Sequence, residues 1–160
     1  MIIGNKYLKN IFKNGDENQY QPNSFDLKLN KVYIISRTYD KVGIIKGEKH
    51  LPNLVEISTN YNGDYLLEPL NTYIVEIEDD IEIPNDVAQF YLIRSTLLRC
   101  GITTCTALGD SGFKGHLMFL LKNESLNNVY ITKGERIATA VNFEVAGASL
   151  YDGDYNECNE

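Results

Sequence analysis

The sequence TYIVEIE at residues 72–78 carries tyrosine, valine and isoleucine at every second position. A period of two is typical of a β-strand with one buried face. Other short segments of β-branched and aromatic residues alternate in the same way or form brief apolar runs, at residues 31–36, 42–45, 54–58, 116–121, 128–132 and 136–143. Because turn-forming sequences such as YNGD, IPND and TKGE lie between the segments, we expect an all-β sandwich or barrel.

Two segments are candidates for helices. Residues 5–14, NKYLKNIFKN, carry apolar side chains near helical spacing. Residues 86–101, DVAQFYLIRSTLLRCG, are ambiguous, because the preceding Pro-Asn could help to cap a helix, whereas the apolar run at residues 90–93 suits a buried strand. In the second case a short helix would follow at residues 95–99. We therefore expect one or two short helices beside the strands.

Length and charge limit the classes of protein to which this chain can belong. A chain of 160 residues is most simply one domain with a single core. The formal net charge is −7 and acidic residues cluster at residues 76–82, so we expect no nucleic-acid polymer as a partner. We also expect no membrane span, because no apolar run approaches the roughly 20 residues needed to cross a bilayer. The small, polar and acidic residues 144–160 predict a mobile C-terminal arm after a barrel domain at residues 1–143.

The cysteines predict a reducing environment. Cys100, Cys105 and Cys158 include no CxxC pair, and the N-terminal MIIGNKYLKN lacks the apolar core of a signal peptide. These features favour free thiols and a cytoplasmic location, which would be the host cytoplasm if the chain is viral. We expect Cys100 and Cys105 to be small core residues.

Three segments concentrate residue types that suit phosphate chemistry. IRSTLLR at residues 93–99 offers guanidinium, hydroxyl and backbone N–H donors at the start of a short helix. GDSGFKG at residues 109–115 places Asp110 between glycines, where a carboxylate could activate water. The third segment is KGERIAT at residues 133–139. Taken alone, the three also fit a helix cap with a surface arginine, a β-hairpin turn and a turn between two strands.

Taken in order, four motifs resemble those of the trimeric deoxyuridine triphosphatase and deoxycytidine triphosphate deaminase superfamily: PNSFDLKL (22–29), EIPNDVAQFYLIRSTLLRCGI (82–102), TALGDSGFKGHLMF (106–119) and ITKGERIATAVNF (131–143). The spacing from Arg94 to Asp110 is similar to that of the short, archaeal-type members. The tail LYDGDYN (150–156) resembles their Tyr-x-Gly-x-Tyr-Gln arm. The resemblance implies a distorted jelly-roll-like β-barrel that forms a homotrimer with shared active sites.

The resemblance also implies the reaction, which is hydrolysis of dUTP to dUMP and pyrophosphate. Asp110 would orient and deprotonate the water that attacks the α-phosphorus. Mg²⁺ would bridge the phosphates, with Asp26 acting on it through water. The phosphate-binding residues implied, of which the first three would come from a neighbouring subunit, are Arg94, Ser95, Thr96, Thr139 and Lys114.

The nucleoside would be recognised by the hairpin that follows Asp110. In the resembled family, main-chain groups at the positions of Ala107 and Met118 bind uracil. Phe113 occupies the place of an aromatic residue that packs beneath the sugar, where a 2′-hydroxyl would collide or stay unpaired. Tyr155, together with Tyr151, would stack on the base as the arm closes.

Three departures from the family pattern bear on the function. Leu120 stands where deaminases carry a glutamate that moves protons, which argues against dCTP deamination. Thr139 replaces a phosphate-binding glutamine, and residues 144–160 contain no basic residue for the outer phosphate. The alternatives to a dUTP diphosphatase are therefore a catalytically silent or regulatory nucleotide-binding relative and, with less support, a dCTP deaminase.

Overall fold

The longest strand, β2 (Ser24–Ile35), is central to the fold and pairs with four other strands. The computed structural model describes residues 1–156. Its main sheet is antiparallel with the order β10-β12-β7-β2-β14-β9. The other strands of this path are β7 (Thr72–Ile77), β9 (Val87–Ile93), β10 (Ile102–Cys105), β12 (Met118–Asn123) and β14 (Arg136–Glu144). Two short strands, β1 (Tyr20–Gln21) and β5 (Leu54–Glu56), also pair with β2.

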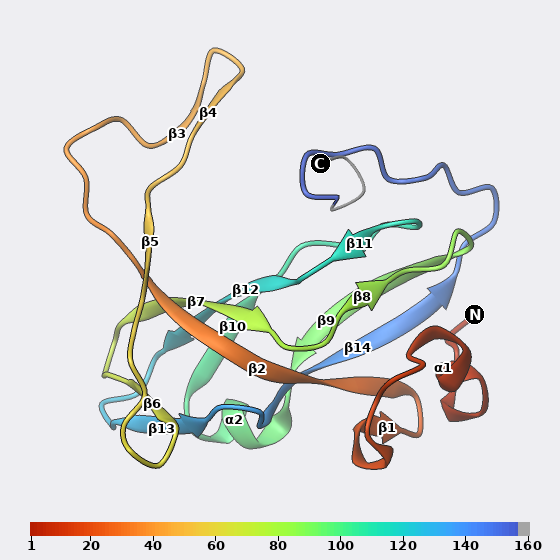
Figure 1. Ribbon diagram of the computed structural model, residues 1–160, viewed down its shortest axis with the longest axis horizontal. Helices are drawn as coiled ribbons and strands as arrows, with labels where there is room; N and C mark the ends of the chain where they lie inside the picture. The colour runs from red at the N-terminus through yellow and green to blue at the C-terminus, as the bar shows by residue number, and fades with distance from the viewer. Residues whose placement is uncertain (157–160) are drawn as a thin grey trace.

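The two ends of this path approach each other, so the sheet curves into a nearly closed barrel (Figure 1). Just beyond β10, Thr106 Oγ1 donates a hydrogen bond of 3.3 Å to the carbonyl of Tyr91 in β9. Two backbone hydrogen bonds of 2.8 and 2.9 Å then join Gln89 to Gly109. The all-β barrel expected from the sequence is confirmed.

The barrel interior is filled by the alternating residues of its strands. In β7 the side chains of Tyr73, Val75 and Ile77 are buried, as the alternation at residues 72–78 predicts. Phe25, Leu27, Leu29 and Val32 of β2, Phe119 and Leu121 of β12, and Ile137 and Ala140 of β14 pack in the same core. Burial of these side chains provides the main stabilisation of the fold.

Short elements surround the barrel. The helices are α1 (Asn5–Ile11), α2 (Ser95–Arg99) and the 3₁₀ turn η1 (Glu17–Gln19). Residues 86–101 therefore form a strand followed by a short helix, which was one of the two alternatives. Three two-stranded sheets complete the fold and pair β6 (Asp64–Leu67) with β13 (Val129–Thr132), β8 (Ile81–Glu82) with β11 (Lys114–Gly115), and β3 (Gly43–Ile45) with β4 (Glu48–His50).

The β3–β4 hairpin extends away from the barrel, and the C-terminal segment after β14 lies on the same side of the molecule (Figure 1). Within residues 1–156, no helix has the length and apolar character required to span a membrane. Cys100 and Cys105 are free thiols and both are exposed, so the expectation that they are core residues is wrong. Cys158 lies outside the described residues.

Candidate active site

A cavity of about 650 Å³ lies between the turn that carries Asp110, strand β12 and the C-terminal arm. Its volume falls within the range of about 300–1,000 Å³ that is typical of small-molecule sites. The lining includes five residues that were predicted from the sequence as catalytic or nucleoside-binding: Ala107, Asp110, Phe113, Met118 and Tyr155. The structure thus brings one set of predicted residues together in a single pocket.

The glycines on either side of Asp110 shape this pocket for two different reasons. Phe113 N donates a 3.1 Å hydrogen bond to the carbonyl of Asp110, which closes a four-residue turn. Gly112, third in this turn, has φ +82°, a conformation that glycine adopts without strain. Gly109 is needed for space, because a Cβ atom there would lie 2.3 Å from the hydroxyl of Tyr91. The turn therefore packs closely on β9 while the Asp110 side chain stays exposed.

A buried hydrogen-bonded chain supports the turn from below. The Tyr91 hydroxyl donates to Gln89 Oε1 at 2.8 Å, and Gln89 Nε2 donates to Asn142 Oδ1 at 2.9 Å. Burial raises the pKa of Tyr91, and the nearby Asp110 carboxylate raises it further, so this phenol stays protonated at neutral pH. Tyr91 lines the cavity but was not predicted from the sequence. The available signal was Gln89, a polar residue at an inward-facing position of β9.

The C-terminal arm contributes to the lining of the cavity and contacts the neighbouring residues 111–114 at three points. Tyr151 N donates a 2.8 Å hydrogen bond to the carbonyl of Ser111. The Tyr151 ring meets the Phe113 ring edge to face, with centroids 5.6 Å apart. Asn156 Oδ1 accepts a hydrogen bond of 3.2 Å from Lys114 N. The arm is therefore in position to contact a ligand held in the cavity.

The predicted phosphate residue Arg94 belongs to a second cluster, around Asp26. Thr139 of β14 is paired in register with Asp26 of β2. Arg94 Nε and a terminal nitrogen of Arg136 each lie 3.2 Å from Asp26 Oδ2, whose side chain is only 4% exposed. Burial raises the pKa of Asp26, and the two guanidinium groups and the Thr139 hydroxyl oppose that rise. The cluster is thus a nearly buried carboxylate balanced by two arginines.

The remaining predicted residues are placed as follows. Ser95 and Thr96 are exposed at the start of α2. Lys114 Nζ forms an ion pair of 2.7 Å with Glu82 on the paired strand β8. Leu120 is half-buried on β12, opposite Cys105 of β10. This aliphatic side chain can neither donate nor accept a proton.

The Asp110 pocket and the Arg94 cluster lie at opposite ends of β9. Asp110 follows Gly109, which is bridged to Gln89 near the start of the strand, whereas Arg94 follows its last residue. Five residues of extended strand, at about 3.4 Å each, place Gln89 and Arg94 roughly 17 Å apart. Within one chain, the predicted phosphate residue Arg94 and the predicted base Asp110 therefore do not meet.

Magnesium is compatible with the pocket only if the substrate supplies most of its ligands. Among the described residues there is no group of three or more His, Cys, Asp or Glu side chains that could hold a metal ion. Mg²⁺ is commonly bound through substrate phosphates and water rather than by an all-protein cage. The Asp26 carboxylate is occupied by Arg94 and Arg136, so its water-mediated contact with Mg²⁺ stays a prediction.

Comparison with known proteins identifies the family. Residues 5–145 match the family described as dCTP deaminase-like. The chain is 40% identical to the "Probable deoxyuridine 5′-triphosphate nucleotidohydrolase" of Methanopyrus kandleri, over 97% of this chain and 99% of that protein. It is 35% identical to the deoxyuridine 5′-triphosphate nucleotidohydrolase of Methanocaldococcus jannaschii, over 97% and 98% of the two chains.

A solved structure agrees on the fold. The 2′-deoxycytidine 5′-triphosphate deaminase of Agrobacterium tumefaciens superposes with a TM-score of 0.66 at 19% identity. The match covers 88% of this chain and 47% of that protein, so this chain spans about half its length. The likeness concerns the barrel, since at this identity it carries no information on the reaction. By the family match and the two full-length relatives, the chain belongs to the dCTP deaminase-like family.

Proposed function

We propose that this protein hydrolyses dUTP to dUMP and pyrophosphate. The observation that carries the proposal is the position of Asp110, whose exposed carboxylate stands in the wall of a cavity of nucleoside size. Two relatives at 35–40% identity, each matched over nearly its full length, are named as nucleotidohydrolases of this substrate. Asp110 would take a proton from a water molecule aligned for attack on the α-phosphorus.

The strand register supports the proposed recognition of the base. The β10–β12 ladder ends at the pair Cys105 and Leu120. Continuing the same antiparallel register would place Ala107 opposite Met118, yet beyond Cys105 the ladder stops and both residues line the cavity. Their main-chain groups are thus available to a pyrimidine edge placed between the strands. Phe113 would pack against the sugar, and Tyr155 would cover the base from the arm.

We further propose that the enzyme is a homotrimer in which each site combines two subunits. The separation of Asp110 from Arg94 along β9 supports this arrangement, because a triphosphate bound at Asp110 would need its cationic contacts from another chain. Arg94 and its neighbours Ser95 and Thr96 would bind phosphate oxygens, with Thr139 nearby. Mg²⁺ would supply charge neutralisation on the triphosphate.

An assay with individual nucleotides tests the reaction. We expect dUTP with Mg²⁺ to yield dUMP and pyrophosphate, and we expect dCTP to yield no ammonia, because Leu120 offers no proton donor or acceptor. A chelator should abolish dUTP hydrolysis. Ammonia released from dCTP would contradict the role given to Leu120. Tight nucleotide binding without pyrophosphate would instead identify a catalytically silent relative.

Mixing two inactive variants tests the shared site. Asp110→Asn and Arg94→Gln, each made alone, should have little activity, and Arg136 should keep Asp26 paired in the second variant. When the two are co-expressed with different tags and purified as mixed oligomers, each mixed trimer should contain one complete site of three, so about a third of normal turnover should return. Mixed oligomers that stay as inactive as the separate variants would contradict a shared site. Light scattering on the unmodified protein should give the mass of a trimer.

A further inference from the structure

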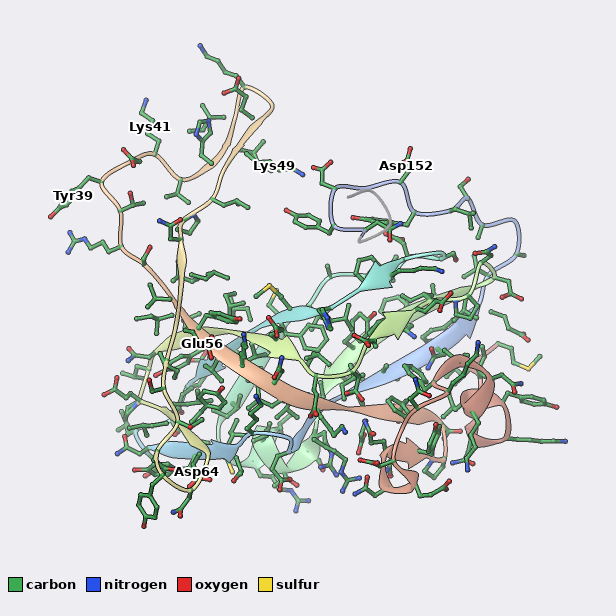
Figure 2. The ribbon with its side chains drawn as sticks, viewed as in Figure 1. Tyr39, Lys41, Lys49, Glu56, Asp64 and Asp152 are labelled. Atoms are coloured by element: carbon green, nitrogen blue, oxygen red, sulfur yellow. The ribbon has the colours of Figure 1, made fainter. Side chains whose placement is uncertain are left out.

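The β3–β4 hairpin and the C-terminal arm meet at one side chain. Lys49 of β4 forms an ion pair and hydrogen bond with Asp154. The Lys49 ammonium also lies over the Tyr155 ring, 5.1 Å from its centroid. Figure 2 shows Lys49 pointing from the hairpin toward the arm, whereas Lys41, which lies just before β3, points away from it. One lysine thus joins two segments that are 105 residues apart in the sequence.

Both contacts act on residues that line the cavity. Asp154 and Tyr155 belong to the part of the arm that lines the pocket. The hydrogen bond with Lys49 lowers the pKa of Asp154, and the same hydrogen bond raises the pKa of Lys49, so both groups are charged at neutral pH. An ammonium over an aromatic face is attracted by the negative potential of the ring. Lys49 therefore restrains this segment by two interactions of different kinds.

In the described part of the arm, two further attachments lie on either side of this contact. Its attachment to the wall uses Tyr151, which is bound to Ser111 and Phe113, and Asn156, which is bound to Lys114 N. Between them, Asp154 and Tyr155 are exposed. A surface segment without buried apolar anchors opens readily, so each tether changes its closed population appreciably.

We propose that Lys49 is a positioning residue that holds the C-terminal arm closed over the cavity. The hairpin then has a role at the site even though it contributes no lining residue. The consequence for catalysis rests on the proposed function, because it assumes that the nucleotide occupies this cavity. A closed arm would lower KM by restricting escape of the bound nucleoside, without contacting the reacting phosphate.

The arm can be observed directly because the protein contains no tryptophan. A Tyr155→Trp substitution creates a single fluorescent reporter at the contact. In this background and without nucleotide, we expect Lys49→Gln and Asp154→Asn each to increase acrylamide quenching measurably above that of the parent, and Lys49→Arg to preserve the parent value. The double exchange Lys49→Asp with Asp154→Lys should recover part of the protection.

Two matched variants serve as controls. Lys41→Gln removes a lysine just before the β3–β4 hairpin, and Asp152→Asn removes an exposed carboxylate of the same arm (Figure 2). Neither should change quenching. In the protein that keeps Tyr155, Lys49→Gln should raise KM for dUTP about 2- to 10-fold with kcat nearly unchanged.

The outcomes separate this proposal from the proposed reaction. Equal quenching in the parent, Lys49→Gln and Asp154→Asn variants would overturn the positioning role, as would an equal effect of Lys41→Gln. A clear difference in quenching together with an unmodified protein that does not hydrolyse dUTP would support the Lys49 contact and reject the reaction.

Discussion

Replacement of Asp110 by Asn is expected to lower dUTP turnover by about 10²–10⁴-fold, the loss typical of removing a positioned general base. Asn has nearly the same shape and accepts turn conformations, so the hydrogen bond from Phe113 N to the residue 110 carbonyl should persist. Nucleotide affinity should therefore change little. Single-turnover kinetics and equilibrium binding of dUTP measure the two quantities separately.

Asp152 provides a matched control for this substitution. It is an exposed aspartate on the arm and is not among the residues that line the cavity. Asp152→Asn should keep normal turnover, so a general effect of lost negative charge can be excluded. Near-normal hydrolysis by the Asp110→Asn protein would remove the catalytic role from Asp110 and leave it as a turn residue.

Replacement of Gly109 by Ala is expected to destabilise the protein by about 1–3 kcal/mol and to disable the site. The added methyl group would lie 2.3 Å from the Tyr91 hydroxyl, 2.8 Å from Ile83 Cδ1 and 2.9 Å from Gln89 Cβ. Because these residues are buried, the turn that carries Asp110 would have to move. Thermal unfolding at a fixed protein concentration should show a decrease in Tm of about 3–10 °C.

A second substitution tests whether contact with the Tyr91 hydroxyl causes the loss of stability in Gly109→Ala. Tyr91→Phe removes the oxygen closest to the new methyl group, so the double variant should be more stable than the sum of the single effects predicts. Tyr91→Phe alone should be mildly destabilising, because Gln89 Oε1 loses its donor. Gly4 offers a control glycine, since a Cβ atom there would meet nothing closer than 3.4 Å. A Gly109→Ala protein with unchanged Tm would show that the close packing at Tyr91 is unimportant.

The sequence identified several strands of the barrel and its small sheets from short β-branched and aromatic segments. β7, β12, β13 and β14 were all expected within a few residues of their observed bounds. β2 was expected only from residue 31, although it begins at Ser24. Its first part does alternate, with Phe25, Leu27 and Leu29 between polar residues, but the register shifts between Leu29 and Lys31, so one period does not run through the whole strand.

The sequence did not identify the shortest strands. β1, β8 and β11 have two residues each, which is too few for a period to be visible. They form because a partner already held in the fold offers unpaired backbone groups, as β8 does for β11. The exposed positions of Cys100 and Cys105 were also misjudged, since small residue size alone does not determine burial.

The sequence by itself determined the fold class and the chemistry of the candidate site. Strand periodicity is a local property, and the turn at residues 110–113 is also local, because Asp, Ser and Gly in this order favour it. Only the tertiary structure decided which of these groups share a pocket. It placed Tyr91 under Gly109, separated Asp110 from Arg94 along β9, and joined Lys49 to Asp154. The physical reason is that these relations depend on strand register, barrel closure and loop direction, which are set by packing between residues far apart in the chain and have no local period from which to be read.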